Sequence, residues 1–228
     1  MHLSALLPLS LLPVLASAHF DLTFPKPRGS NHDSQADFPC GGASASKRTA
    51  LSLDDPQLSI AAKMGHDQNA VQVLLALGTD PGTNFNITLF DTFRQTGLGD
   101  FCFPPIKLTE ELLGTPLTEG LNATLQVVTN GDPTGGLYNC ADITFASITT
   151  LTVPTCKNGT GVTAEPFSAE AAARNANEST PNGQAQSGGA GGHPSGPGSP
   201  SSTGAAMPLQ TAAWGVMGAA VLGGVALL

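Results

Sequence analysis

The residues of this sequence best suited to chemistry are three histidines, His19, His32 and His66. His19 directly follows the small-residue triplet Ala-Ser-Ala at positions 16–18, which fits signal peptidase, so cleavage there would make it the first residue. An N-terminal histidine offers its α-amine and its ring Nδ1 to one metal ion, and a second imidazole opposite them completes a histidine brace. Because nitrogen ligands in a near-planar array favour copper, such a brace would bind copper through His19, although a histidine can also stand first by chance.

The second and third ligands are less clearly marked. His66 lies in a polar stretch before the apolar run 71–77, where its side chain could project toward the N-terminus, although a surface histidine is the ordinary interpretation. His32 competes with it for the same role. Asp142 is a candidate carboxylate ligand that would favour Cu(II) over Cu(I), and its ordinary interpretation is a solvated strand residue.

An apolar leader precedes His19. Residues 3–16 form an almost unbroken apolar run that is too short to span a membrane, which is typical of a secretory signal peptide over residues 1–18. The segment before this run has no Lys or Arg, which is unusual for a leader. The alternative is an apolar strand or helix that stays in the folded protein.

The C-terminal part of the sequence predicts a segment that tethers the domain to a membrane. Residues 163–202 are rich in Ala, Gly, Ser and Pro, a composition that predicts a disordered stalk. An apolar tail ends the sequence without any basic residue after it, and small residues precede it, which is the layout of a glycosylphosphatidylinositol (GPI) attachment signal. We expect attachment at Ser202, loss of 203–228, and a GPI-anchored protein on the extracellular face of the plasma membrane. The alternative is a true C-terminal membrane span.

Four cysteines fall in the remaining domain, residues 19–162. Cys40, Cys102, Cys140 and Cys156 are an even number in an exported chain, which predicts two disulfides whose pairing the sequence leaves open. A zinc site is the alternative, but no two of these cysteines have the close spacing that zinc sites usually have.

Alternating apolar and polar residues predict an all-β sandwich with solvated outer faces. Alternation runs through 20–24, 84–89, 121–127 and 143–153, Gly and Pro clusters separate these segments, and a short helix near 56–63 is conceivable. Four Asn-x-Ser/Thr sites predict N-glycosylation, two of them on the expected solvated faces. These sites are Asn86, Asn122, Asn158 and Asn177.

The charge balance and the missing motifs exclude several functions. Seventeen acidic residues against nine Lys and Arg argue against a nucleic-acid partner. The sequence holds no serine-hydrolase Gly-x-Ser-x-Gly motif, no Walker A loop and no dinucleotide-binding fingerprint.

Several motifs in one order resemble the fungal LPMO-like X325 family, which is related to the copper acquisition factor Bim1. They are the leader ending before His19-Phe20, Pro25-Lys-Pro-Arg28, Phe38-Pro-Cys40-Gly-Gly42, His66, Asp100-Phe-Cys102 and Tyr138-Asn-Cys140-Ala-Asp142-Ile-Thr-Phe145. The resemblance implies an immunoglobulin-like or fibronectin-like sandwich that binds one copper ion through His19, His66 and Asp142. It also implies copper uptake or homeostasis at the cell surface, with a membrane copper transporter or a metalloreductase as a partner.

Two other functions remain open at this point. The same kind of copper site serves lytic polysaccharide monooxygenases, so an oxidase of cell-wall polysaccharide is one alternative. The expected mature chain retains Tyr138 but loses Trp214, so apart from phenylalanines it has one aromatic residue for docking a polysaccharide, and this favours binding over catalysis. A metal-free wall or adhesion module is the other alternative.

Overall fold

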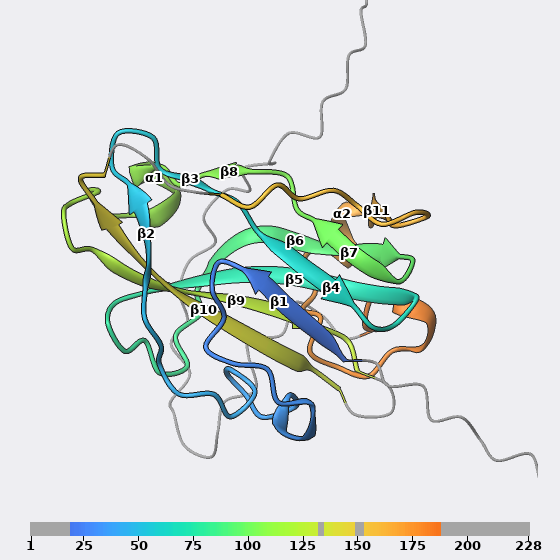
Figure 1. The fold of residues 1–228 in the computed structure, drawn as a ribbon. Coiled ribbons are helices and arrows are strands. Elements are labelled where there is room, and N and C mark those ends of the chain that lie inside the picture. Colours follow the sequence, from blue (N-terminus) through green and yellow to red (C-terminus); the bar gives the residue numbers. More distant parts are fainter. Residues whose placement is uncertain (1–18, 132–134, 149–152, 188–228) are drawn as a thin grey trace, which may run out of the picture. The chain divides into compact units, whose positions relative to one another are not determined.

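The predicted β-sandwich with two disulfides is confirmed by a computed structural model that describes residues 19–131, 135–148 and 153–187 (Figure 1). The leader, residues 188–228 of the stalk and anchor signal, and the predicted attachment site at Ser202 lie outside the described residues.

Two main sheets build the sandwich. The smaller sheet has the order β1 (Phe20–Phe24), β4 (Ala61–Met64), β7 (Gly99–Cys102). The larger one has the order β11 (Thr163–Pro166), β6 (Ile87–Thr96), β5 (Gln68–Leu77), β9 (Asn122–Thr129), β10 (Leu137–Ala146), β2 (Thr49–Ser52). The remaining elements are the ladder of β3 (Gln57–Leu58) and β8 (Ile106–Lys107), the short helices α1 (Glu110–Leu113) and α2 (Ala169–Ala172), and the 3-10 turns η1 (His32–Ser34) and η2 (Pro181–Gly183).

The main core lies between the two sheets. Figure 1 shows β1 and β4 lying across the larger sheet. Phe20 and Leu22 of β1 point inward because alternate residues of a strand face opposite sides, and they meet Val73 of β5 and Ile143 of β10 in one buried cluster. The same alternation leaves His19 and Asp21 on the outer side of the smaller sheet. The core therefore fixes which residues at the start of β1 remain accessible.

A second buried cluster covers part of the outer face of the larger sheet. The disulfide between Cys40 and Cys140 lies in it, and Tyr138 packs edge-on against Phe38. The predicted solvated face of 121–127 is therefore wrong, because Gln126 is buried and donates a hydrogen bond to the Pro39 carbonyl at 2.7 Å. The second disulfide joins Cys102 to Cys156.

Two predicted elements differ in the structure. Residues 56–63 form no helix, because β4 is hydrogen-bonded between β1 and β7 and its buried residues alternate as strand residues do. The strand predicted over 143–153 begins earlier, at Leu137, and ends at Ala146, while 149–152 lie outside the described residues. The strand predicted at 20–24 is confirmed as β1.

The first part of the predicted stalk is folded. Residues 163–166 form β11 and pair antiparallel with β6, and farther along the chain Ala176 and Gln186 are buried. Folded chain thus continues past the predicted boundary at 162, because an unpaired sheet edge can satisfy the backbone of a segment that has little apolar surface of its own. Within the described parts of the chain, no helix is long and apolar enough to cross a membrane.

Candidate metal centre

Pairing of β1 with β4 places His19 beside the segment that carries His66. Phe20 is opposite Met64, and the Gly65 amide donates a hydrogen bond to the His19 carbonyl at 3.0 Å. His66 follows directly in sequence. His19 directly precedes β1 and His66 lies in the turn after β4, so these two histidines are at the same end of the β1–β4 pair.

Two buried amide side chains fix the backbone next to His19. Gln35, 1% exposed, accepts a hydrogen bond from the Phe20 amide at 3.3 Å and donates one to the Phe20 carbonyl at 2.5 Å. Asn139 of β10 donates to the same carbonyl at 3.1 Å. The peptide that follows His19 is thus held on both sides, which limits the movement of the first residue of the domain.

The turn η1 places the ring of His32 against the ring of His19. The Asn31 side chain caps this turn by accepting a hydrogen bond from the Asp33 amide. The two imidazole rings are stacked, with centroids 4.7 Å apart and planes at 15°. Gln35, one residue past the end of the same turn, also bonds to Phe20, so the segments that carry the two histidines are joined directly.

Asp21 lies beside His32 on the outer side of β1. Its Oδ1 is 3.1 Å from His32 Nε2 and also accepts a hydrogen bond from the Ser30 hydroxyl. Partial burial raises the pKa of Asp21, but these hydrogen bonds and the positive charges of His32 and Lys63 outweigh it, so the pKa lies below its usual value. The carboxylate is therefore ionised next to the paired imidazoles at neutral pH.

The ring of His66 is oriented by the first residues of β5, which follow it. Its Nδ1 is 2.8 Å from the Gln68 carbonyl, and the Asn69 side chain donates to the His66 carbonyl at 2.9 Å. Because a carbonyl only accepts, Nδ1 carries the hydrogen and Nε2 keeps its lone pair. Metal-binding histidines usually have one ring nitrogen fixed in this way.

Asp142, by contrast, forms an ion pair with Arg28 and is wholly buried. Arg28 donates from Nε to one carboxylate oxygen at 3.0 Å and from Nη2 to the other at 2.8 Å. The Ser46 amide and the Thr124 hydroxyl donate as well. Burial raises the pKa of Asp142, but these donors and the Arg28 charge outweigh it, and the pKa lies below its usual value.

The structure gives Asp142 a structural role in this ion pair, and its predicted role as a metal ligand stays a prediction. Both carboxylate oxygens already accept hydrogen bonds, and the side chain lies on the face of β10 opposite to Ala141 and Ile143, which face the core below β1. The structure thus brings His19, His32 and Asp21 together and separates Asp142 from them.

The donors at the start of β1 fit copper chemically. Among residues 19–131, 135–148 and 153–187 there is no ready group of three His, Cys, Asp or Glu side chains that could hold a metal. A metal ion bound at the start of β1 would therefore need a further donor, such as the α-amine that cleavage before His19 would create. With that amine, imidazole nitrogens predominate, and such a set selects copper over harder metals.

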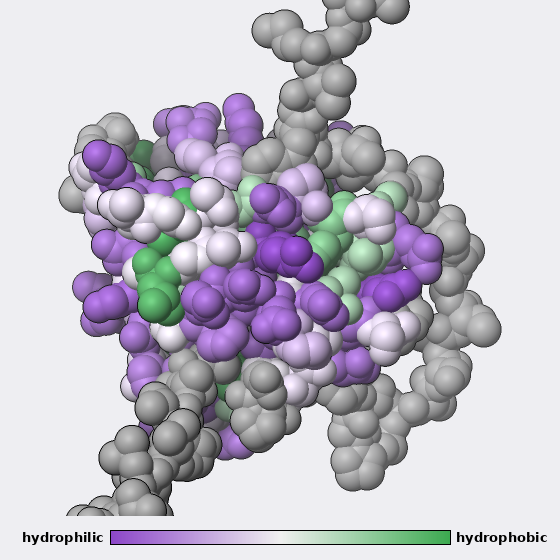
Figure 2. Space-filling view, turned by 90° about the vertical axis from the view of Figure 1, so that its right-hand side faces the viewer, coloured by the Kyte–Doolittle hydropathy of each residue, from purple (hydrophilic) through white to green (hydrophobic). Residues whose placement is uncertain are grey.

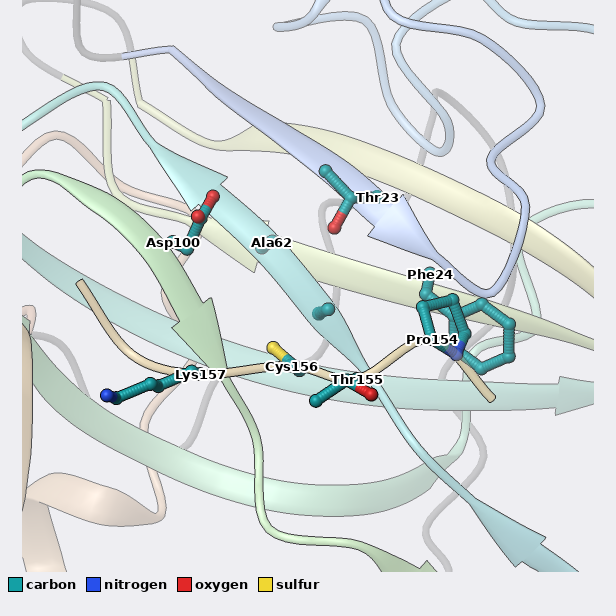
Figure 3. A pocket seen from close by; sticks show the side chains of 9 residues that line it. Thr23, Phe24, Ala62, Asp100, Pro154, Thr155, Cys156 and Lys157 are labelled. Atoms are coloured by element: carbon teal, nitrogen blue, oxygen red, sulfur yellow. The ribbon is translucent and has the colours of Figure 1, made fainter. Parts of the chain in front are cut away.

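A pocket of about 250 Å³ lies at the other end of β1. Figure 3 shows residues 154–157 crossing over β4, with Phe24 and Pro154 at one end of the pocket and Asp100 and Lys157 at the other. Its lining contains neither histidine nor a free thiol, because Cys156 is bonded to Cys102. It does not have the ligand chemistry of the histidine cluster.

The surface at the β1 end is mainly hydrophilic. Figure 2 shows this side of the molecule with polar residues in the centre and small, separate apolar patches. Among the sequons, Asn86 and Asn158 are exposed, and Asn122 and Asn177 are partly buried. Asn158 Oδ1 accepts a hydrogen bond from the Cys102 amide at 2.8 Å, which orients this side chain beside β7.

Comparison with known proteins adds three relatives. An uncharacterized protein of Aspergillus fumigatus is 52% identical over 235 residues, covering 96% of this chain and 97% of the relative. The lytic polysaccharide monooxygenase-like protein X325 of Yarrowia lipolytica is 32% identical, covering 74% of this chain and 64% of the relative. The copper acquisition factor BIM1 of Cryptococcus neoformans var. neoformans is 31% identical, covering 59% of this chain and 63% of the relative.

The fold and these relatives place the chain in the class of copper-related fungal β-sandwich proteins. The profile of the family described as copper acquisition factor BIM1-like matches residues 17–161, which is more than half of the chain. The chain belongs to this BIM1-like family, and the resemblance drawn from its motifs is confirmed.

Proposed function

We propose that the protein binds one Cu(II) ion at the cell surface and serves in copper uptake or homeostasis. The observation that carries this proposal is the position of His19 before β1, held through Phe20, stacked on His32 and hydrogen-bonded to Gly65 beside His66. Membership of the copper acquisition factor BIM1-like family supports it. His19 would supply its α-amine and Nδ1, and His66 would supply Nε2.

Copper in this proposal is the ion that is captured and released, so the protein acts as a binder and not as an enzyme. The fixed ring of His66 and the clamped backbone at Phe20 lower the conformational entropy that is lost when the ion binds. The partner that receives the ion would be a membrane copper transporter or a metalloreductase. The name of the X325 relative favours one second candidate, a copper-dependent oxidase of cell-wall polysaccharide. Reductant-dependent peroxide consumption together with oxidised oligosaccharide products would favour that candidate instead.

The location is part of the same proposal. A signal peptide over 1–18, glycans on the four sequons and a GPI lipid at Ser202 would place the domain outside the plasma membrane. Release of the protein from intact cells by phosphatidylinositol-specific phospholipase C would support the anchor. Retention after this treatment, with the C-terminal tail still detectable by mass spectrometry, would contradict it.

Electron paramagnetic resonance tests the copper site. We expect the mature chain that begins at His19, loaded with one equivalent of Cu(II), to give one defined signal with nitrogen couplings. One extra residue before His19 removes the α-amine from the chelate while leaving the ring, so we expect the signal to change and the affinity to fall sharply. Equal affinity of the extended chain would show that the brace is wrong.

A further inference from the structure

We propose that His32 is a ligand of the copper ion bound at His19 and is the position through which this ion enters and leaves. The inference rests on the proposed copper function and adds a residue of this chain to it. It comes from the turn η1, which holds His32 over His19 although thirteen positions separate them in the sequence.

The distance between the rings suits a shared ion. Two imidazoles on one metal, with metal–nitrogen bonds of about 2 Å, have ring centres roughly 4.5 to 6 Å apart. His19 and His32 have centroids 4.7 Å apart. Because the rings are now stacked, one of them must turn about its side-chain bonds before both face one ion, while Gln35 holds the backbone at Phe20.

Asp21 prepares His32 for this role. In the neutral form of His32, with Nε2 donating to the Asp21 carboxylate, the lone pair is on Nδ1. A carboxylate behind a histidine both orients the ring and raises its basicity, and this arrangement recurs behind metal-binding histidines. His66 is oriented in the same way, but with the two ring nitrogens exchanged. Its Nδ1 is fixed by the Gln68 carbonyl, and in the neutral ring Nε2 keeps the lone pair.

Exposure separates the roles of the two histidines. The side chain of His32 is 50% exposed, whereas that of His66 is 22% exposed and bonded to the Gln68 carbonyl. An incoming ion or a receiving ligand from a partner therefore reaches His32 more easily. His32 would accordingly exchange first, while His19 and His66 keep the ion.

Four forms of the mature chain test this inference, each loaded with one equivalent of Cu(II). They are the wild type, His32→Ala, Asp21→Ala and His66→Ala, with Ala36→Ser as the control on the same exposed stretch. Pulsed paramagnetic resonance counts the coordinated imidazoles, and competition with a chelator gives the affinity and the rate of release. Thermal unfolding checks that the exposed substitutions leave the fold intact.

We expect three coordinated imidazoles in the wild type and two in His32→Ala. Asp21→Ala should keep three but weaken binding by roughly 10- to 100-fold, as loss of an outer partner of a ligand does. Ala36→Ser should match the wild type. If His66→Ala alone changes the count and His32→Ala matches the wild type in count, affinity and release rate, the role of His32 is wrong and the proposed function stands. If the wild type itself gives no nitrogen-coupled signal, the proposed function fails.

Discussion

Two carboxylates of this domain form ion pairs with basic residues, and their surroundings differ sharply. Asp142 is 0% exposed and meets Arg28, which is 10% exposed, through two hydrogen bonds. The side chain of Asp21 is 40% exposed and meets His32, which is 50% exposed, through one ring nitrogen. Burial and the number of donors make the first carboxylate part of the framework and leave the second available for chemistry.

The difference teaches how a candidate ligand should be judged. An acidic residue near a disulfide in a family-like motif looks suited to a metal, and Asp142 has this position beside Cys140. Four donor groups already surround it, however, so binding a cation would require breaking the pair with Arg28. The Asp21 side chain contacts Ser30 and His32 through Oδ1, and the His32 ring stacks on His19.

The largest effect is expected from Asp142→Asn. The substitution removes the charge and leaves Arg28 buried without its counter-ion, which costs roughly 3–5 kcal/mol in the free energy of unfolding. Urea denaturation with both disulfides intact measures this loss. Copper affinity of the folded fraction should stay at the wild-type value, and a selective loss of copper with full stability would instead support Asp142 as a ligand.

A smaller effect is expected from Gln35→Met. The Gln35 side chain joins the segment of η1 to β1 through its two hydrogen bonds with Phe20. The substitution leaves the Phe20 amide without its acceptor, and an unsatisfied buried group costs about 1–3 kcal/mol. Because Gln35 also follows the turn of His32, the copper signal should broaden or split as well. Asn139→Ala removes only one donor to the Phe20 carbonyl, so it serves as the matched control, and an equal broadening there would show that the effect is not specific to Gln35.

The pH dependence of stability separates the two carboxylates further. The pKa of Asp142 is lowered in the folded chain, so its stabilisation is fully present above the unfolded pKa of about 4 and is lost as the pH falls through the lower folded pKa. We expect the free energy of unfolding to fall between about pH 5 and pH 2. Asp142→Asn should flatten this fall more than Asp21→Asn does, and urea curves across this range decide. Equal slopes for both variants would contradict the comparison.

The smallest effect on stability is expected from Asp21→Ala. An exposed ion pair contributes less than about 1 kcal/mol, so the free energy of unfolding should hardly change. Thermal unfolding at neutral pH measures it. A loss as large as that of Asp142→Asn would mean that Asp21 belongs to the framework and would remove the contrast between the two pairs.

The sequence predicted the parts of the fold that depend on local pattern. β1 was expected at 20–24 because its residues alternate, and the two disulfides were expected because an exported chain has four cysteines. The pairing itself depends on contacts between residues far apart in the sequence, such as Cys40 and Cys140, and no local pattern encodes them.

The errors have the same physical origin. Arg28 and Asp142 are 114 positions apart, so their ion pair was not visible in the motif around either residue. His32 could be named as a candidate but not preferred, because its stack on His19 depends on where η1 is packed. Residues 163–166 have a stalk-like composition and fold because the edge of β6 accepts them.

The folded segment after Val162 also shortens the stretch of chain that would join the domain to its anchor. Were residues 163–202 all free chain, forty positions would separate the domain from an anchor at Ser202, and they could span up to about 140 Å. The structure describes folded chain as far as Ser187, so fifteen positions remain before Ser202, which reach at most about 50 Å. On a cell with the proposed anchor, the linking chain would therefore keep the histidine cluster in a thin layer next to the membrane. Membrane-embedded acceptors of copper lie in this layer, and the outer part of the cell wall would be out of reach.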